Sequence, residues 1–175
     1  MVDHLLYLII TFVQFPFDGF DGFLIGLIGF GAVGRAIAER LAGWEARIVA
    51  YTPRLRAAPP GVEIVGLDEL LISSDVVMVV AGLNNETRGL LNAERLAKMK
   101  PDAILINTAR GAIVDETALV ETAMRGHLAK IALDVFETEP LPAGSPLRDL
   151  PNAVLTPHMI GQTRESTIAN PAAAI

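Results

Sequence analysis

GLIGFGAVG, residues 26–34, is the stretch of this sequence that decides the fold. An apolar run, Phe23 to Ile28, leads into it, and a helical pattern of small residues, Ala32 to Leu41, leads out of it. A GxGxxG turn between a strand and a helix is the arrangement that holds the pyrophosphate of a dinucleotide. The sequence therefore predicts a dinucleotide-binding unit, and the alternative is an ordinary tight turn that happens to be rich in glycine.

The glycines of the motif have separate physical tasks. Gly29 takes the tight turn without a Cβ penalty, Gly31 leaves room for a pyrophosphate, and Gly34 lets the helix pack close to the strand. The amides of Ala32 and Val33 at the helix start have no intrahelical acceptor and lie at the positive end of the helix dipole. We expect all five residues to form the phosphate-binding part of a cofactor site.

Composition limits the classes of partner. The chain has 175 residues, of which 51% are hydrophobic and 19% charged, so it is globular and long enough for one domain. A net charge of −6 argues against nucleic acid as a partner. There is no cysteine, which excludes disulfides and cysteine metal sites, and the histidines lack metal-ligand spacing. We expect no metal.

Residues 5–13 form an apolar segment near the start of the chain. The segment is shorter than the roughly 18–20 residues that a membrane-spanning helix needs. Asp3 precedes it and no small-residue cleavage site follows, which argues against a secretory signal. We expect a packed helix ended by Pro16, no membrane partner and a cytoplasmic protein.

Strands and helices alternate along the rest of the chain. Apolar runs predict strands at 23–28, 46–51, 63–65, 75–80, 103–107, 130–135 and 153–156. Helical patterns fall at 67–72, 93–99, 116–124 and 162–168, with Asn92 and Asp115 as candidate N-caps. Because the strands are apolar throughout, a parallel sheet covered on both faces is expected. The predicted fold is a single α/β domain with a doubly wound, Rossmann-like parallel sheet.

The end of the second strand should select the cofactor. An acidic residue about 20 positions beyond the glycine turn binds the ribose 2′-hydroxyl in many dinucleotide folds. Thr52 stands there instead, followed by Arg54 and Arg56. A hydroxyl and a guanidinium suit a 2′-phosphate, so the sequence favours NADP(H), with NAD(H) as the second choice. The alternative is that both arginines are solvated loop residues.

Arg110, Glu139 and His158 each lie just beyond the C-terminal end of a predicted strand. In an open parallel sheet these ends share one edge, where ligands bind. Histidine can transfer a proton near neutral pH, a carboxylate can orient it, and a guanidinium can hold a substrate carboxylate. Beside a nicotinamide, this set would reduce a 2-keto acid. Each residue could instead be an ordinary surface residue, as we expect of His127 at a helix end.

Four segments together carry a family resemblance: GLIGFGAVG, NETRGLLNAERLAKMKPDAILINTARG, ALDVFETEPLP and LTPHMIG. The sequence resembles the D-isomer-specific 2-hydroxyacid dehydrogenases, which include glyoxylate/hydroxypyruvate reductases and phosphoglycerate dehydrogenases. The resemblance implies that Arg110, Glu139 and His158 are catalytic. Further cofactor contacts are expected at Thr108, Ala109, Asp134 and Gly161, with Asp134 holding the nicotinamide carboxamide.

The sequence departs from this family at several points. Thr52 replaces the usual aspartate, and Val80-Ala81-Gly82 stands where a His-x-Pro-like stretch is common. We expect a linker helix and connector at 1–22, an NAD(P)-binding domain at 23–161 and a truncated C-terminal helix at 162–175, with the substrate domain absent. The resemblance also implies a homodimer. The sequence therefore predicts a dehydrogenase of small 2-hydroxy acids, or alternatively a self-associating cofactor-binding fragment without turnover.

Overall fold

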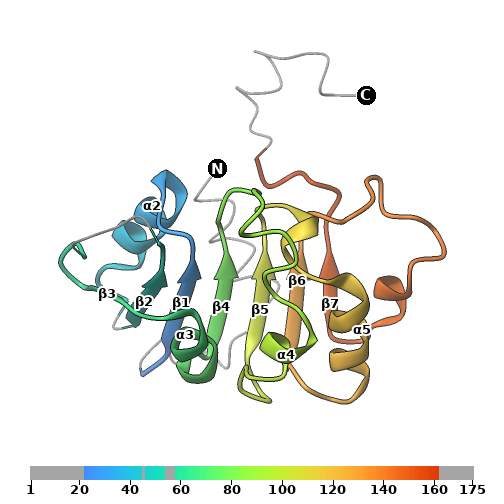
Figure 1. The fold of residues 1–175 in the computed structure, drawn as a ribbon, viewed down its shortest axis with the longest axis horizontal. Helices are drawn as coiled ribbons and strands as arrows, with labels where there is room; N and C mark the ends of the chain where they lie inside the picture. Colours follow the sequence, from blue (N-terminus) through green and yellow to red (C-terminus); the bar gives the residue numbers. More distant parts are fainter. Residues whose placement is uncertain (1–21, 45, 54–57, 162–175) are drawn as a thin grey trace, which may run out of the picture.

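The computed structural model describes residues 22–44, 46–53 and 58–161. Its centre is a seven-stranded sheet in the order β3-β2-β1-β4-β5-β6-β7, and every adjacent pair of strands is parallel (Figure 1). The strands are β1 (Leu24–Ile28), β2 (Arg47–Tyr51), β3 (Val62–Ile64), β4 (Val76–Val79), β5 (Ile104–Asn107), β6 (Lys130–Leu133) and β7 (Ala153–Leu155). The predicted doubly wound α/β fold is confirmed.

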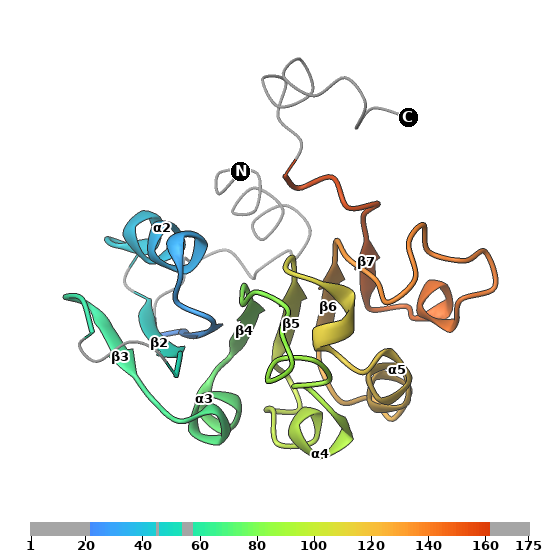
Figure 2. The same cartoon turned by 45° about the horizontal axis from the view of Figure 1, so that its top comes forward.

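Helices lie on both faces of the sheet. Figure 2 shows α3, α4 and α5 side by side along one face, with α2 on the other. Their bounds are α2 (Ala32–Leu41), α3 (Leu67–Ser73), α4 (Ala93–Leu96) and α5 (Glu116–Met124). Among the helices of the described residues, none is long and apolar enough to cross a bilayer. The helices expected at 5–13 and 162–168, and with them the expected terminal segments, lie outside the described residues.

Two of the helices begin where the sequence predicted. The Asn92 side chain accepts a hydrogen bond from the Arg95 amide at 3.0 Å, and the Asp115 side chain accepts one from the Ala118 amide at 3.0 Å. These N-caps satisfy amides that the helix itself cannot pair. Asp115 also fixes the start of α5, which borders the candidate site.

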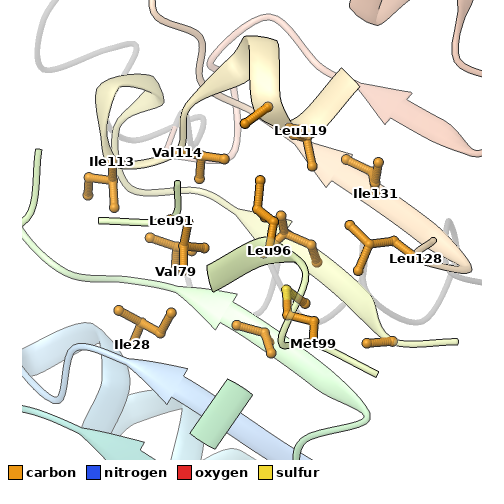
Figure 3. Packing of buried hydrophobic residues seen from close by; sticks show 14 of the residues in the cluster. Ile28, Val79, Leu91, Leu96, Met99, Ile113, Val114, Leu119, Leu128 and Ile131 are labelled. Carbon is orange, nitrogen blue, oxygen red and sulfur yellow. The ribbon is translucent and has the colours of Figure 1, made fainter. Parts of the chain in front are cut away.

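Burial on both faces explains why the strands are apolar throughout. Along β4, Val77 and Val79 pack into a core cluster with α3, α4 and α5, whereas Val76 and Met78 pack into the cluster on the α2 side. Figure 3 shows part of the larger cluster, in which Leu96 and other apolar side chains fill the space between helices and sheet. A strand buried on both faces has no position for an in–out alternation.

The strand order reverses next to β1. The chain runs outward from β1 through β2 to β3, and then crosses back to add β4 on the other side of β1. The loops that follow β1 and β4 therefore diverge to opposite faces of the sheet. In folds of this class, such a point holds the ligand, at the C-terminal ends of the strands.

Candidate functional site

The glycine turn joins β1 to α2 with no space to spare at two of its positions. Gly29 has a φ of 102°, and a Cβ there would lie 2.6 Å from the Ala81 Cα. A Cβ on Gly34 would lie 2.6 Å from the Gly29 carbonyl oxygen. Gly31 differs, because nothing lies within 4 Å of the corresponding point. Gly29 and Gly34 thus allow close packing inside the protein, while Gly31 borders open space.

The start of α2 offers unpaired donors beside that space. Gly31 is the N-cap residue, and its carbonyl accepts the hydrogen bond from the Arg35 amide at 3.0 Å. The amides of Ala32 and Val33 precede this bond, so the helix provides no acceptor for them. An open glycine next to such amides fits the diphosphate of a dinucleotide.

A cavity of about 420 Å³ lies at the C-terminal edge of the sheet. Its lining comes from the start of α2 and from the segments that follow β4, β5, β6 and β7. The lining residues are Val33, Val80, Ala81, Gly82, Leu83, Thr108, Ala109, Arg110, Asp134, His158, Ile160 and Gly161. The structure therefore brings together seven of the residues that the sequence singled out: Val33, Thr108, Ala109, Arg110, Asp134, His158 and Gly161.

Asp134 is a buried carboxylate with three hydrogen bonds. Its side chain is 2% exposed and accepts from the Thr156 hydroxyl at 2.6 Å, the Met159 amide at 2.9 Å and the Ile160 amide at 3.0 Å. These bonds compensate the cost of burying the group. They also fasten residues 156–160, which carry His158, to the end of β6.

His158 and Glu139 form a close pair. The imidazole Nδ1 lies 2.7 Å from Glu139 Oε2, and Glu139 Oε1 accepts from the Phe136 amide at 3.0 Å. Because an ionised carboxylate only accepts, Nδ1 carries the proton of this bond and Nε2 stays available to a ligand. His158 has a φ of 50°, a left-handed conformation that non-glycine residues seldom adopt.

The electrostatics of the pair favour an ionised Glu139. Partial burial alone would raise the pKa of this carboxyl. The hydrogen bonds from His158 and the Phe136 amide, with the charges of His158 and Arg110, outweigh burial and hold the pKa of Glu139 below its ordinary value. Glu139 is therefore a charged hydrogen-bond acceptor for the imidazole near neutral pH.

Arg110 follows β5 in a turn that Asn107 braces. The Asn107 amide nitrogen Nδ2 donates to the Arg110 carbonyl at 3.1 Å, and its Oδ1 accepts from the Ala109 amide at 3.1 Å. Asn107 is 1% exposed, whereas Arg110 is exposed and lines the cavity that His158 also lines. The turn thus presents a guanidinium to the same space as the imidazole.

A second cavity, of about 540 Å³, lies on the other side of His158. Glu139 lines this cavity rather than the first, together with residues that include Phe136, Leu141 and Arg148. His158 lines both cavities. The His158–Glu139 pair therefore forms part of the wall between them.

Other predicted site residues lie apart from these cavities. Thr52 is half-buried directly after β2 and is outside both linings as the described residues define them. Arg54 and Arg56 fall outside the described residues. The His127 Nε2 lies 3.0 Å from the Met99 carbonyl, an internal contact that fits its expected structural role.

Sequence reasoning missed several residues that shape the site. Asn107 and Thr156 orient their neighbours, and each is a polar residue at the end of an apolar strand run, a signal that was available. Leu83 and Ile160 line the first cavity, and no local pattern marks them. Their role depends on contacts between segments far apart in sequence.

Comparisons with known proteins agree with this geometry. A family model described as D-isomer specific 2-hydroxyacid dehydrogenase, NAD binding domain, matches residues 14–160. The chain is 46% identical over 149 residues to a glyoxylate reductase from Thermofilum pendens, covering 83% of this chain and 44% of that enzyme. It is 41% identical over 161 residues to a D-3-phosphoglycerate dehydrogenase from Mycobacterium bovis, covering 89% and 30%.

Solved structures show the same likeness. A D-isomer specific 2-hydroxyacid dehydrogenase from Xanthobacter autotrophicus Py2, in complex with NADPH and MES, superposes with a TM-score of 0.84 at 34% identity, covering 99% of this chain and 79% of that one. An NAD-dependent formate dehydrogenase from Staphylococcus aureus, in complex with NAD, gives 0.82 at 37% identity, covering 86% and 45%. The chain spans less than half the length of the curated relatives it matches. Because the family model covers most of its residues, the chain belongs to the D-isomer-specific 2-hydroxyacid dehydrogenases and contains their NAD-binding domain.

Proposed function

We propose that this chain is the cofactor-binding part of an NAD(P)-dependent oxidoreductase that interconverts small 2-keto and 2-hydroxy acids. One observation carries the proposal: the His158 Nδ1 lies 2.7 Å from Glu139, and His158 shares a cavity with the Arg110 guanidinium. That cavity also contains Val33 from the start of α2, next to the amides suited to a diphosphate. A proton donor, an anion-binding group and a cofactor cradle thus meet at one edge of the sheet.

The residues divide the chemistry among them. A bound nicotinamide supplies the hydride that reduces the carbonyl carbon. His158 Nε2 gives a proton to the carbonyl oxygen during reduction and takes it back during oxidation. Glu139 fixes the imidazole through Nδ1 and stabilises its protonated form. Arg110 holds the substrate carboxylate by two-point hydrogen bonding and orients the carbonyl.

Other residues would hold the cofactor. Gly31, Ala32 and Val33 receive the diphosphate, with Gly29 and Gly34 keeping the turn in shape. Thr108, Ala109, Asp134 and Gly161 surround the nicotinamide end. Asp134 Oδ2 accepts a single hydrogen bond in the structure, from Ile160, which leaves it acceptor capacity for a carboxamide N–H.

We propose a preference for NADP(H), with Thr52 and Arg54 contacting the 2′-phosphate. Support comes from the absence of a carboxylate at Thr52, directly after β2. Thr52→Asp should weaken NADPH binding by about tenfold or more, because like charges at a binding site cost several kcal/mol. Titration of the wild type and the variant with NADPH and NADH checks this, and tighter wild-type binding of NADH would contradict it.

Turnover is tested by following NADPH oxidation with glyoxylate or hydroxypyruvate. The proposal expects oxidation that depends on His158 and on a carboxylate in the substrate. A second candidate is a self-associating cofactor-binding fragment without turnover. It is favoured by the shares of 44% and 30% that the chain covers of its relatives, since the rest of those enzymes has no counterpart here. Cofactor binding without oxidation would select the second candidate.

We also propose that the chain forms a homodimer, as the family resemblance implies. Sedimentation velocity over a range of protein concentrations measures this directly. A single species with the mass of one chain at all concentrations would contradict a dimer.

A further inference from the structure

The start of α5 is joined to the segment after β6 by a reciprocal pair of hydrogen bonds. The Glu137 amide donates to Oε1 of Glu116, and the Glu116 amide donates to Oε1 of Glu137 at 3.4 Å. Glu116 is the first residue of α5, and Glu137 lies two residues before Glu139. The proposed function uses neither Glu116 nor Glu137.

A second observation places the same two segments in direct contact. A Cβ on Gly111 would coincide with the carbonyl group of Phe136 and the amide of Glu137, so the two backbones touch there. Arg110 immediately precedes Gly111, and Glu139 follows Glu137 by two residues. The contact therefore sets the distance between the turn that carries Arg110 and the segment that carries Glu139.

We propose that Glu116 is a positioning residue for the Glu139–His158 pair, acting through its hydrogen bond to the Glu137 amide. The importance of that pair rests on the proposed function, but the positioning itself does not require turnover. Arg148 holds the other end of the same segment, donating to the carbonyls of Leu141 at 2.8 Å and Pro142 at 3.0 Å. Glu116 fixes the end nearer to Arg110.

The charges around Glu116 support this role. Burial raises the pKa of Glu116, the Glu137 amide lowers it, and the charges of Glu137 and Glu139 raise it further. Among the described residues, no cation forms an ion pair with Glu116. A carboxylate in such surroundings gains nothing from ion pairing, so its favourable contact is the hydrogen bond to the Glu137 backbone.

Two variants separate the reach of the side chain from its charge. Glu116→Gln keeps the length and an acceptor oxygen but removes the charge, whereas Glu116→Asp keeps the charge but is one methylene too short to reach the amide. Both residues are acceptable in the first turn of a helix, so both variants should fold. The matched control is Glu121→Ala on the same helix, which removes an exposed carboxylate paired with Arg125 at 3.1 Å.

The readout is the His158–Glu139 hydrogen bond itself. The low-field proton resonance of the His158 Nδ1–H in ¹⁵N-histidine-labelled protein reports this bond, and His158→Ala identifies the signal. We expect Glu116→Asp to weaken or remove the resonance and to return the carboxyl pKa of Glu139 toward its ordinary value. Glu116→Gln and Glu121→Ala should leave both unchanged.

Other results would overturn the inference. The resonance could persist in Glu116→Asp, or both Glu116 variants could lose it equally, which would assign the effect to charge. The wild type offers an independent test: the Glu137 amide shift should follow the ionisation of Glu116, with the His158 resonance changing in parallel. Because no substrate is needed, an inactive wild type that passes these tests would refute the proposed function and leave Glu116 as a positioning residue.

Discussion

Glu139 accepts hydrogen bonds from both the His158 imidazole and the Phe136 amide, so its protonation affects stability as well as chemistry. Its folded-state pKa is lower than the ordinary value of 4.5. A depressed carboxyl pKa stabilises the folded protein above the unfolded value, and this contribution is lost as the pH falls through the folded value. The sign of the pH dependence therefore follows from the direction of the shift.

Glu139→Gln tests that sign. The variant should be less stable than the wild type at about pH 6, and the difference should shrink as the pH falls below 4.5, because the wild-type carboxylate is then protonated too. Urea unfolding of both proteins across this pH range measures the difference. A deficit that stays constant with pH would show that ionised Glu139 contributes nothing specific.

His158→Ala should lower kcat for keto-acid reduction by about 10²- to 10⁴-fold, the usual contribution of a general acid–base group. The Kd for the cofactor should hardly change, because the proposed diphosphate contacts lie at the start of α2. Met159→Ala is the matched control, since its backbone amide, which bonds Asp134 at 2.9 Å, is retained. Full activity in His158→Ala would refute the proposed mechanism.

Single residues were predictable where chemistry and chain position coincide. Arg110, Glu139 and His158 stand out because each is polar and follows an apolar strand run. The need of Asp134 for a partner followed from the cost of a buried carboxylate, but its partners Thr156 and Ile160 lie 22 and 26 residues away. The contact between Glu116 and Glu137 likewise spans 21 residues and arises only from folding.

At the scale of elements, the turn between β1 and α2 combines a rigid part with an open part. Gly34→Ala should cost about 1–3 kcal/mol of unfolding free energy, because a Cβ there lies 2.6 Å from the Gly29 carbonyl oxygen and α2 must move. Gly31→Ala should change stability by less than about 1 kcal/mol, since Gly31 has a φ of −81° and nothing lies near its Cβ position.

The Gly31→Ala variant should nevertheless lose cofactor affinity, because its methyl group occupies the space proposed for the diphosphate. Urea unfolding and cofactor titration of the same two variants provide both measurements. Unchanged cofactor binding in Gly31→Ala would place the diphosphate elsewhere.

Element types were predictable from hydrophobic patterns, and element ends less so. All seven strands appear where apolar runs predicted them, because burial on both faces leaves a continuous signal. The helix expected at 93–99 ends at Leu96, since the Lys98 and Met99 amides bond carbonyls three residues back, at Arg95 and Leu96. Such tight turns satisfy the last amides without another α-helical turn, and local sequence does not distinguish the two.

At the scale of the molecule, cofactor binding and folding are linked. A ligand that binds only the folded state at 100 times its Kd adds about 2.7 kcal/mol to the unfolding free energy. For a domain of this size that corresponds to a rise in Tm of roughly 5–10 °C. Differential scanning calorimetry should show this rise with NADPH for the wild type and for His158→Ala, and little rise for Gly31→Ala. No rise in the wild type would contradict cofactor binding.

The position of His158 between two cavities affects how the pair is supplied with hydrogen ions. Substrate and nicotinamide would fill the space on the Arg110 side, while Glu139 faces the other cavity and is exposed. Bulk water therefore reaches the imidazole by a back route through the carboxylate. Recharging the acid after each cycle then does not have to wait for the product to leave.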